Sequence, residues 1–291
     1  MKLGIIGNLN KPELTEAVAL FVQRLERTGI EYLIEEKIAL LLSSNEHTIP
    51  EDRRAPGEVC TTAGDMLVAF GGDGTILSAA RGVGSSGIPI LGINLGKLGF
   101  LAEVAPSEIN EAIQDIVEQR YVLEERLLLQ ASSPGLPGRV LHAVNDIVIK
   151  ARSSRMIDLE THVNGTFAVT YRGDGLIVST PTGSTAYALS NSGPIVIPTC
   201  KVFGLTPISP HTLSGRPLII PDNSVIRVCV KAEGEEVLVS TDGQEESLVK
   251  PPLEIIVRKA EYTLRLVRRL NHSYFDLLRA KLLWGRDPRS P

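Results

Sequence analysis

An uninterrupted apolar stretch that stops at a glycine-rich loop constrains this chain more than any other feature. Residues 66–70, MLVAF, are apolar at every position, which is typical of a strand buried on both faces of a parallel sheet. The next five residues, GGDGT at 71–75, precede a helical pattern. Such a loop places backbone N–H groups and a helix dipole where phosphate oxygens can bind. The pattern predicts an α/β fold with an anion-binding loop.

Strand and helix signals alternate along the first part of the chain. Residues 2–7 form an apolar strand pattern, and residues 14–25 carry apolar side chains at helical spacing. We predict an open, doubly wound α/β domain over residues 1–121. Residues 43–62 are polar and mixed, so we expect a mobile surface loop there.

The hydrophobic period changes to two from residue 122 onward. Short β-rich segments follow, bounded by Pro, Gly, Asp or Asn, among them residues 157–163 and 263–267. We predict a mostly antiparallel β domain over residues 122–268. The tail, residues 269–291, contains apolar side chains at helical spacing, so we expect a C-terminal helix that packs back on the first domain.

Composition and charge exclude several classes of protein. A chain of 291 residues that is 43% hydrophobic can bury the cores of two domains. The net charge of -4, with scattered basic residues, argues against nucleic acid or anionic membranes as partners. The sequence has neither a signal peptide nor a bilayer-spanning run, so we expect a cytoplasmic protein. Cys60, Cys200 and Cys229 fit neither a disulfide framework nor a zinc site.

The acidic residue of the glycine-rich loop, Asp73, is unusual beside a phosphate site. Phosphate oxygens repel a carboxylate unless it meets a hydroxyl proton or a cation. The loop therefore favours phosphoryl transfer over simple nucleotide binding. The alternative is a tight strand-to-helix turn in which Asp73 only caps the helix.

A second glycine-flanked aspartate, Asp174, opens a stretch that is rich in hydroxyl groups. Residues 173–187, GDGLIVSTPTGSTAY, combine six hydroxyl side chains with almost no charge. Such small donors and acceptors suit a sugar and a diphosphate, with a base against Tyr187. A buried strand followed by a Ser/Thr-rich turn is the alternative.

Two further polar positions interrupt apolar patterns or lie in loops. Asn145 and Asp146 stand between apolar segments, where a ligand would explain them, or alternatively a β-bulge or turn. His211 and Gln244 are weaker candidates, because loop residues of these types are more often structural.

Together these segments resemble the NAD kinase family. The loop at 71–75 alone is shared with diacylglycerol kinases, sphingosine kinases and phosphofructokinases. Residues 94–101, Asn145 with Asp146, and residues 173–187 and 210–217 resemble NAD kinases more closely than lipid kinases in their order and spacing.

The resemblance implies roles for individual residues. Asp73 would accept a proton, and Asn145 and Asp146 would bind the adenosine ribose or base of NAD. The family often has glutamate where this chain has Asp146. The other nucleotide-binding residues implied are Gly72, Gly74, Thr75, Phe100, Arg155, Arg172, Asp174, Thr185, Ala186, Tyr187, Ala188, Leu189, Ser190 and Gln244.

The resemblance also implies a reaction and partners. ATP with Mg²⁺ would meet NAD at a cleft between the two domains and phosphorylate the 2′-hydroxyl of its adenosine ribose, giving NADP. NAD kinases form homodimers or homotetramers whose sites borrow residues from a neighbouring subunit. Members that also use polyphosphate tend to have glycine at the position of Arg172, so we expect ATP to be preferred here.

Two alternatives remain at this point. A diacylglycerol- or sphingosine-type lipid kinase would need an apolar acceptor groove, which the polar residues 173–187 disfavour. A non-catalytic dinucleotide-sensing module would keep the NAD site without turnover, which an intact Asp73 disfavours.

Overall fold

The chain folds into two compact units. The computed structural model describes residues 1–43, 48–136, 140–153, 155–212, 214–232, 236–270 and 273–282. One unit consists of Met1–Glu125 with the described part of Arg265–Pro291, and the other of Arg126–Leu264. The first is an α/β unit and the second is built of antiparallel β-sheets, which confirms the predicted fold class.

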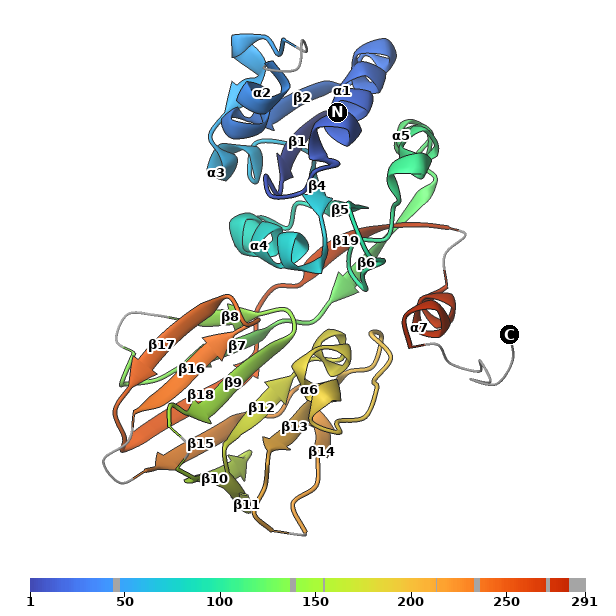
Figure 1. The fold of residues 1–291 in the computed structure, drawn as a ribbon. Helices are drawn as coiled ribbons and strands as arrows, with labels where there is room; N and C mark the ends of the chain where they lie inside the picture. Colours follow the sequence, from blue (N-terminus) through green and yellow to red (C-terminus); the bar gives the residue numbers. More distant parts are fainter. Residues whose placement is uncertain are drawn as a thin grey trace. The chain divides into compact units, whose positions relative to one another are not determined.

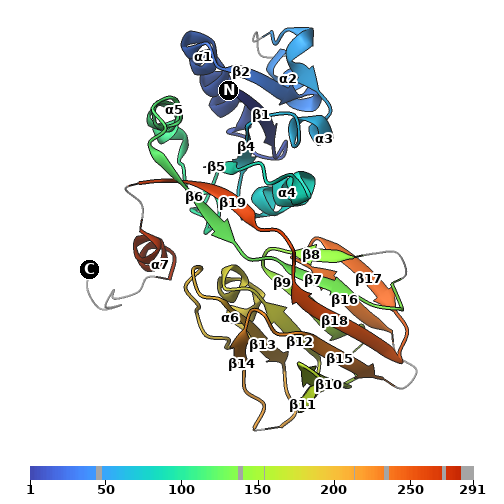
Figure 2. The same cartoon turned by 180° about the vertical axis from the view of Figure 1, so that it is seen from behind.

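A seven-stranded sheet forms the centre of the first unit (Figures 1 and 2). Its strand order is β3-β2-β1-β4-β5-β19-β6, and the pairs from β3 to β19 are parallel. The β4 strand is buried along its whole length, as its apolar sequence predicts. The strands are β1 (Lys2–Gly7), β2 (Glu31–Glu35), β3 (Arg54–Ala55), β4 (Met66–Gly71), β5 (Ile90–Asn94), β6 (Tyr121–Arg126) and β19 (Leu264–Arg269).

Helices cover both faces of this sheet. On one face, α1 (Leu14–Thr28), α2 (Glu36–Ser43) and α5 (Ile109–Val117) share a core with β1, β4 and β5. The other face carries α3 (Gly57–Cys60) and α4 (Asp73–Val83). Gly4 points to α3, where a Cβ atom would lie 1.9 Å from the carbonyl oxygen of Cys60. Helices on both faces are what the doubly wound pattern predicts.

The C-terminal helix α7 (Tyr274–Leu282) belongs to the same unit. Its Leu278 is 2% exposed, and the ring of Tyr274 lies 6.3 Å from that of Phe100. The prediction that this helix packs on the first domain is confirmed. Residues 271–272 and 283–291 of the predicted tail lie outside the described residues.

The winding direction of the first sheet reverses between β1 and β4. The chain runs from β1 to β2 and β3 on one side, and then from β4 to β5 on the other. In open α/β sheets, ligands bind outside the carboxyl ends of the strands at such a switch point. The GGDGT loop follows β4 there.

The second unit is a β-sandwich. Its two six-stranded sheets have the orders β11-β10-β15-β18-β7-β8 and β14-β13-β12-β9-β16-β17, and all adjacent strands are antiparallel. Side chains from both sheets form one apolar core. The strands are β7 (Leu129–Ser132), β8 (Leu141–Ala143), β9 (Asp146–Ala151), β10 (Ile157–Val163), β11 (Thr166–Gly173), β12 (Gly175–Ser179), β13 (Val202–Ile208), β14 (Leu218–Pro221), β15 (Ile226–Lys231), β16 (Val237–Thr241), β17 (Glu245–Val249) and β18 (Leu253–Lys259).

Two predictions about local structure were wrong. The strands β6 and β19 belong to the first sheet, although alternation had grouped them with the antiparallel domain. Alternating apolar and polar residues indicate a half-buried strand, but they do not indicate which strand it pairs with. The described part of residues 43–62 is not a plain loop either, because it contains a 3₁₀ turn (Glu51–Arg53), β3 and α3, with Cys60 buried. Residues 44–47 lie outside the described residues.

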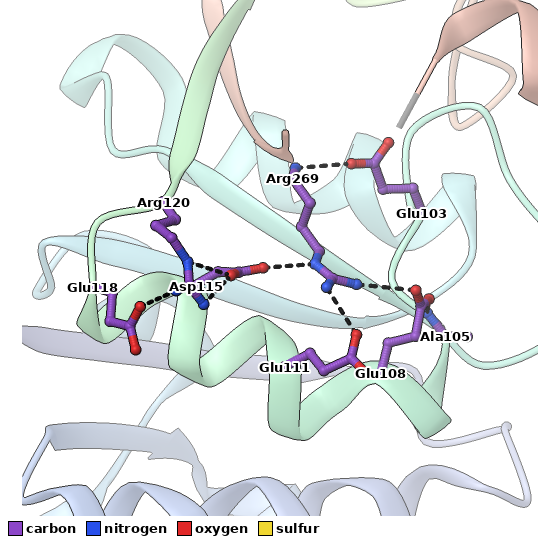
Figure 3. Close-up of polar contacts among 8 residues, drawn as sticks. All are labelled: Glu103, Ala105, Glu108, Glu111, Asp115, Glu118, Arg120 and Arg269. Carbon is purple, nitrogen blue, oxygen red and sulfur yellow. Dashed lines mark hydrogen bonds and ion pairs between the residues drawn. The ribbon is translucent and has the colours of Figure 1, made fainter. Parts of the chain in front are cut away.

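An ion-pair network fixes the end of β19 to α5 (Figure 3). The Arg269 guanidinium lies 3.0 Å from both Glu108 and Glu111 and 2.8 Å from Asp115, and its side chain is 13% exposed. Burial opposes ionisation of Asp115, but hydrogen bonds from Arg269 and Arg120 outweigh it and hold its pKa below the usual value. A mostly buried guanidinium with several carboxylates ties the returning strand firmly to the first unit.

Candidate active site

Backbone N–H groups hold the carboxylate of Asp73. Asp73 is the first residue of α4, and no side chain caps this helix. Its Oδ2 accepts the N–H of Phe100 at 2.8 Å, and its Oδ1 accepts those of Leu101 at 2.9 Å and Ala102 at 3.2 Å. The alternative that Asp73 only caps a helix is therefore wrong. The carboxylate links the loop after β4 to the loop after β5.

The other predicted residues of the GGDGT loop lie in the same turn. The N–H of Thr75 donates to the carbonyl of Gly72 at 2.9 Å, and Gly74 is exposed. A Cβ atom on Gly71 would lie 2.1 Å from Oγ1 of Thr75, so glycine is required where the strand ends. This turn brings Gly72, Gly74 and Thr75 together with Asp73.

A glycine allows the loop after β5 to approach Asp73. A Cβ atom on Gly99 would lie 2.0 Å from the Oδ1 atom of Asp73. Phe100, which the sequence also predicted as a site residue, follows directly and donates its N–H to the same carboxylate. The closeness of these groups explains why a glycine precedes Phe100.

Arg268 holds the same loop from its carbonyl side. Its guanidinium donates to the carbonyl oxygens of Phe100 at 3.0 Å and Leu101 at 3.2 Å. It also pairs with Glu103 and Glu124, at 2.8 Å each, and its side chain is 10% exposed. The loop is thus fixed between a buried guanidinium and the Asp73 carboxylate. Sequence reasoning missed Arg268, because a charge within an alternating strand carries no sign of its partners.

Lys281 of α7 also reaches this loop. Its Nζ atom lies 3.9 Å from Oδ2 of Asp73 and 4.5 Å from the centroid of the Phe100 ring. The side chains of Lys281 and Asp73 are 28% and 30% exposed. Nothing in the sequence pattern singled out Lys281, since lysine is common on the polar face of a helix.

In the second unit, Asp146 is a buried carboxyl group at the start of β9. It is 3% exposed and pairs with Ser179 of β12. Burial, and then the negative charge of Asp242, raise its pKa to about 7, against the hydrogen bond from the N–H of Tyr187. A carboxyl group that titrates near neutrality is typical of a functional site.

Asp242 organises the backbone around Asp146. Its carboxylate accepts the N–H groups of Val144 at 3.0 Å, Asn145 at 2.7 Å and Asp146 at 3.2 Å. Its own N–H donates to the Asp146 carbonyl at 3.0 Å, and its φ of 53° lies in the left-handed region. Sequence reasoning selected Gln244 and missed Asp242, although an aspartate before a glycine between two strands was a visible turn signal.

Several hydroxyl groups of residues 173–187 form hydrogen bonds with backbone groups of the protein. Oγ1 of Thr180 donates to the carbonyl of Val144 at 2.6 Å and accepts the N–H of Gly183 at 3.1 Å. Oγ1 of Thr185 donates to the carbonyl of Thr182 at 3.1 Å. The alternative of a strand followed by a Ser/Thr-rich turn therefore describes these hydroxyl groups well.

The glycine of that turn has a steric role. A Cβ atom on Gly183 would lie 2.0 Å from the carbonyl oxygen of Asn145. Gly183 therefore lets the turn pack directly against Asn145, whose side-chain amide makes no hydrogen bond within the described chain. The neighbouring short helix α6 (Tyr187–Ser190) has Ala188 buried and Tyr187 41% exposed.

One group of predicted residues lies where β9 begins and β12 ends. Asp146 pairs with Ser179, and Thr241, just before the turn of Gln244, pairs with Ile147. The residues at this end are Asn145, Asp146, Thr185, Ala186, Tyr187, Ala188, Leu189, Ser190 and Gln244.

A second group lies at the opposite end of the same strands. The Asp174 carbonyl accepts the N–H of Ala151, the last residue of β9, and Arg155 follows β9. Ser179 is the fifth residue after Asp174 along β12, which corresponds to roughly 16 Å. Arg172 on the edge strand β11 is 61% exposed, 3.8 Å from Asp158. Within one chain, Arg155, Arg172 and Asp174 are not brought to Asp146, and their role in binding stays a prediction.

Neither a metal cluster nor a membrane helix is found in the part of the chain that the structure describes. No three His, Cys, Asp or Glu side chains there are grouped to hold a metal ion. No helix in the same ranges is long and apolar enough to cross a bilayer. Leu213 of the predicted 210–217 motif lies outside these ranges.

An aspartate fixed at the switch point of a doubly wound sheet is suited to phosphoryl transfer, as in a small-molecule kinase. Family models agree: "ATP-NAD kinase N-terminal domain" matches residues 3–121 and "ATP-NAD kinase C-terminal domain" matches residues 144–269. The chain belongs to the NAD kinase family.

Curated relatives are similar over nearly the whole chain. An NAD kinase of Bacteroides fragilis (strain ATCC 25285) is 40% identical over 298 residues, covering 99% of this chain and 100% of the relative. One of Moorella thermoacetica is 42% identical over 287 residues, covering 98% and 90%. These relatives confirm the predicted family and an enzyme that phosphorylates NAD.

Solved structures show the same architecture. A yeast NADH kinase complexed with NADH has a TM-score of 0.90 at 27% identity, over 100% of this chain and 90% of the other. An NAD kinase from Archaeoglobus fulgidus in complex with ATP has a TM-score of 0.74 at 27% identity, over 96% and 99%. The lipid-kinase alternative has no support among these matches.

Proposed function

We propose that this enzyme transfers the γ-phosphoryl group of ATP to the 2′-hydroxyl of the adenosine ribose of NAD, with Asp73 as the proton acceptor. The observation that carries the assignment of Asp73 is its carboxylate, which follows β4 and accepts three backbone N–H groups of the loop after β5. A fixed carboxylate at this place can receive a hydroxyl proton with little reorganisation.

The hydrogen bonds of Asp73 leave one acceptor position on Oδ2. A carboxylate has about four lone-pair sites. Oδ1 accepts two N–H groups and Oδ2 accepts one. The 2′-hydroxyl would therefore donate to Oδ2 while its oxygen attacks the γ-phosphorus. The bond from the γ-phosphorus to its bridging oxygen breaks, and that electron pair leaves with ADP.

Mg²⁺ is proposed to accompany ATP. Magnesium in such sites is held mainly by substrate phosphates and water, with one or two carboxylates, and it offsets the negative charge of the donor.

NAD is proposed to be bound by the residues around Asp146. The half-buried amide of Asn145 and the carboxyl of Asp146 can hydrogen-bond ribose hydroxyls or the base, and the exposed ring of Tyr187 offers a stacking surface. Asp146 is shorter than the glutamate frequent in the family, so its reach depends on the turn that Asp242 fixes.

Arg155, Arg172 and Asp174 can contribute to that site only from another subunit, since they lie at the other end of β9 and β12. This separation supports a homodimer or homotetramer as the active form. A cytoplasmic location remains a proposal that rests on the sequence.

A coupled assay tests the proposed function. Purified protein is given ATP and Mg²⁺ with NAD, NADH, diacylglycerol or sphingosine, and NADP(H) is read with an NADP-specific dehydrogenase. We expect phosphorylation of NAD and none of the lipids. Phosphorylation of a lipid but not of NAD would refute the proposal, and NAD binding without turnover would indicate a sensing module.

A further inference from the structure

The ammonium group of Lys281 lies at the catalytic loop and makes no hydrogen bond with the residues that the structure describes. Its Nζ is 3.9 Å from Oδ2 of Asp73, which is beyond hydrogen-bond range. Its other contact is with the face of the Phe100 ring, at 4.5 Å from the centroid. Within the described chain, none of its three donors is used by another residue.

The position of Lys281 is not needed to dock α7. Leu278, which is 2% exposed, and Tyr274, whose ring lies 6.3 Å from that of Phe100, already attach the helix to the first unit. A lysine that served only as a tether would be expected to donate directly to a carboxylate. Here the ammonium instead lies close to Asp73, and no described residue accepts a hydrogen bond from it.

The proposed reaction brings such an acceptor to this place. The attacking hydroxyl must lie about 2.6–3.2 Å from Oδ2 of Asp73, and about 3–3.5 Å from the γ-phosphorus. Oxygens of the γ-phosphoryl group are therefore only a few ångströms from Oδ2, as is the Nζ of Lys281. A cation that donates to these oxygens would offset the charge of the transferring group.

We propose that Lys281 binds the γ-phosphoryl group of the nucleoside triphosphate donor. The inference rests on the proposed function and adds to it a residue that contacts the donor. In the free enzyme the ammonium group lies beside Asp73 and Phe100. With ATP bound, it donates to a γ-phosphoryl oxygen and remains there as the group moves to the ribose oxygen, while Asp73 takes the proton.

Binding measurements with matched variants test this role. Lys281→Met removes the charge and keeps an unbranched side chain, and Lys281→Arg keeps the charge. Arg279→Met is the control, because Arg279 is a cation on the same helix that pairs with Asp276 instead. Dissociation constants are measured by calorimetry with Mg²⁺ for AMP-PNP, a non-hydrolysable ATP analogue, and for ADP and NAD.

The expected pattern is specific for the γ-phosphoryl group. Lys281→Met should weaken AMP-PNP binding about 10- to 100-fold and change ADP and NAD binding less than about twofold. Its turnover should fall by at least the same factor. Lys281→Arg should recover part of the loss, and Arg279→Met should leave all constants within about twofold.

Three results would overturn the inference: unchanged AMP-PNP binding in Lys281→Met, equal losses for AMP-PNP and ADP, or the same losses in Arg279→Met. Melting temperatures identify a variant that fails to fold, in which case Lys281→Arg supplies the comparison. If the unmodified enzyme makes no NADP from NAD and ATP, the proposed function fails, whereas the contrast between AMP-PNP and ADP still decides the role of Lys281.

Discussion

Replacing Asp146 by asparagine is expected to stabilise the protein at neutral and alkaline pH. Asp146 is 3% exposed, and burial followed by the charge of Asp242 raises its pKa from 3.8 to about 7. An asparagine has the same shape and no ionisable proton. Its amide oxygen can still accept the N–H of Tyr187, and its amide nitrogen can face the Asp242 carboxylate without repulsion.

The size of the effect follows from the pKa shift. Between about pH 4 and pH 7 the folded protein keeps the Asp146 proton that the unfolded chain has lost. Stability from this group is therefore fully present below about pH 4 and is lost as pH rises to 7. At about 1.4 kcal/mol per unit, the variant should gain roughly 1 to 2 kcal/mol over the parent at pH 5, and up to about 4 kcal/mol at pH 8.

Urea unfolding measures this difference. Far-UV circular dichroism follows both proteins from pH 5 to pH 8, and the two units are fitted as separate transitions where they separate. Asp158→Asn, on β10 of the same unit and 43% exposed, is the control and should change the unfolding free energy by less than about 0.5 kcal/mol. A gain that does not grow with pH, or a less stable Asp146→Asn protein at pH 8, would refute the reasoning.

Three further predictions concern catalysis. Asp73→Asn should lower turnover about 10²- to 10⁴-fold with little change in the NAD dissociation constant, and turnover within a few-fold of the parent would leave Asp73 as a loop anchor only. Dilution should reduce activity, because Asp174 lies roughly 16 Å from the Asp146 end of the strands; sedimentation showing a fully active monomer would contradict this. ATP should be used well and polyphosphate poorly, with Arg172→Gly shifting kcat/KM toward polyphosphate, and comparable values for both donors in the unmodified enzyme would rule this out.

Structural elements could be predicted from the sequence where they are determined by residues close together in the chain. The β4 strand and its loop were predictable, because a fully apolar segment must be buried on both faces and the glycines that follow must end it. The hairpin of β10 and β11 could also be predicted, because the sequence Asn164-Gly165 favours a tight turn. Both residues have positive φ in the structure.

Features that depend on distant partners were not predictable from the sequence. The carboxylate of Asp242 accepts hydrogen bonds from the backbone of residues 144–146, which belong to another part of the chain. The sequence around Asp242 does not indicate which residues it contacts. Asp174 lies within the hydroxyl-rich stretch in sequence, but the extended strand β12 separates it from Asp146. The pairing of β19 with β5 could not be predicted either, because the two strands are far apart in sequence.

The sheet of the first unit is completed by β19, which follows the whole second unit in sequence. During synthesis, β1 to β5 emerge long before β19, whereas the second unit is complete in one continuous segment. The β-sandwich can therefore finish folding first and hold the ends of its segment close together, which lowers the entropy cost of bringing β19 to β5. Arg268, which fixes the loop around Asp73, arrives with that last strand. A nascent chain thus gains its ordered catalytic loop only after the whole second unit has been synthesised.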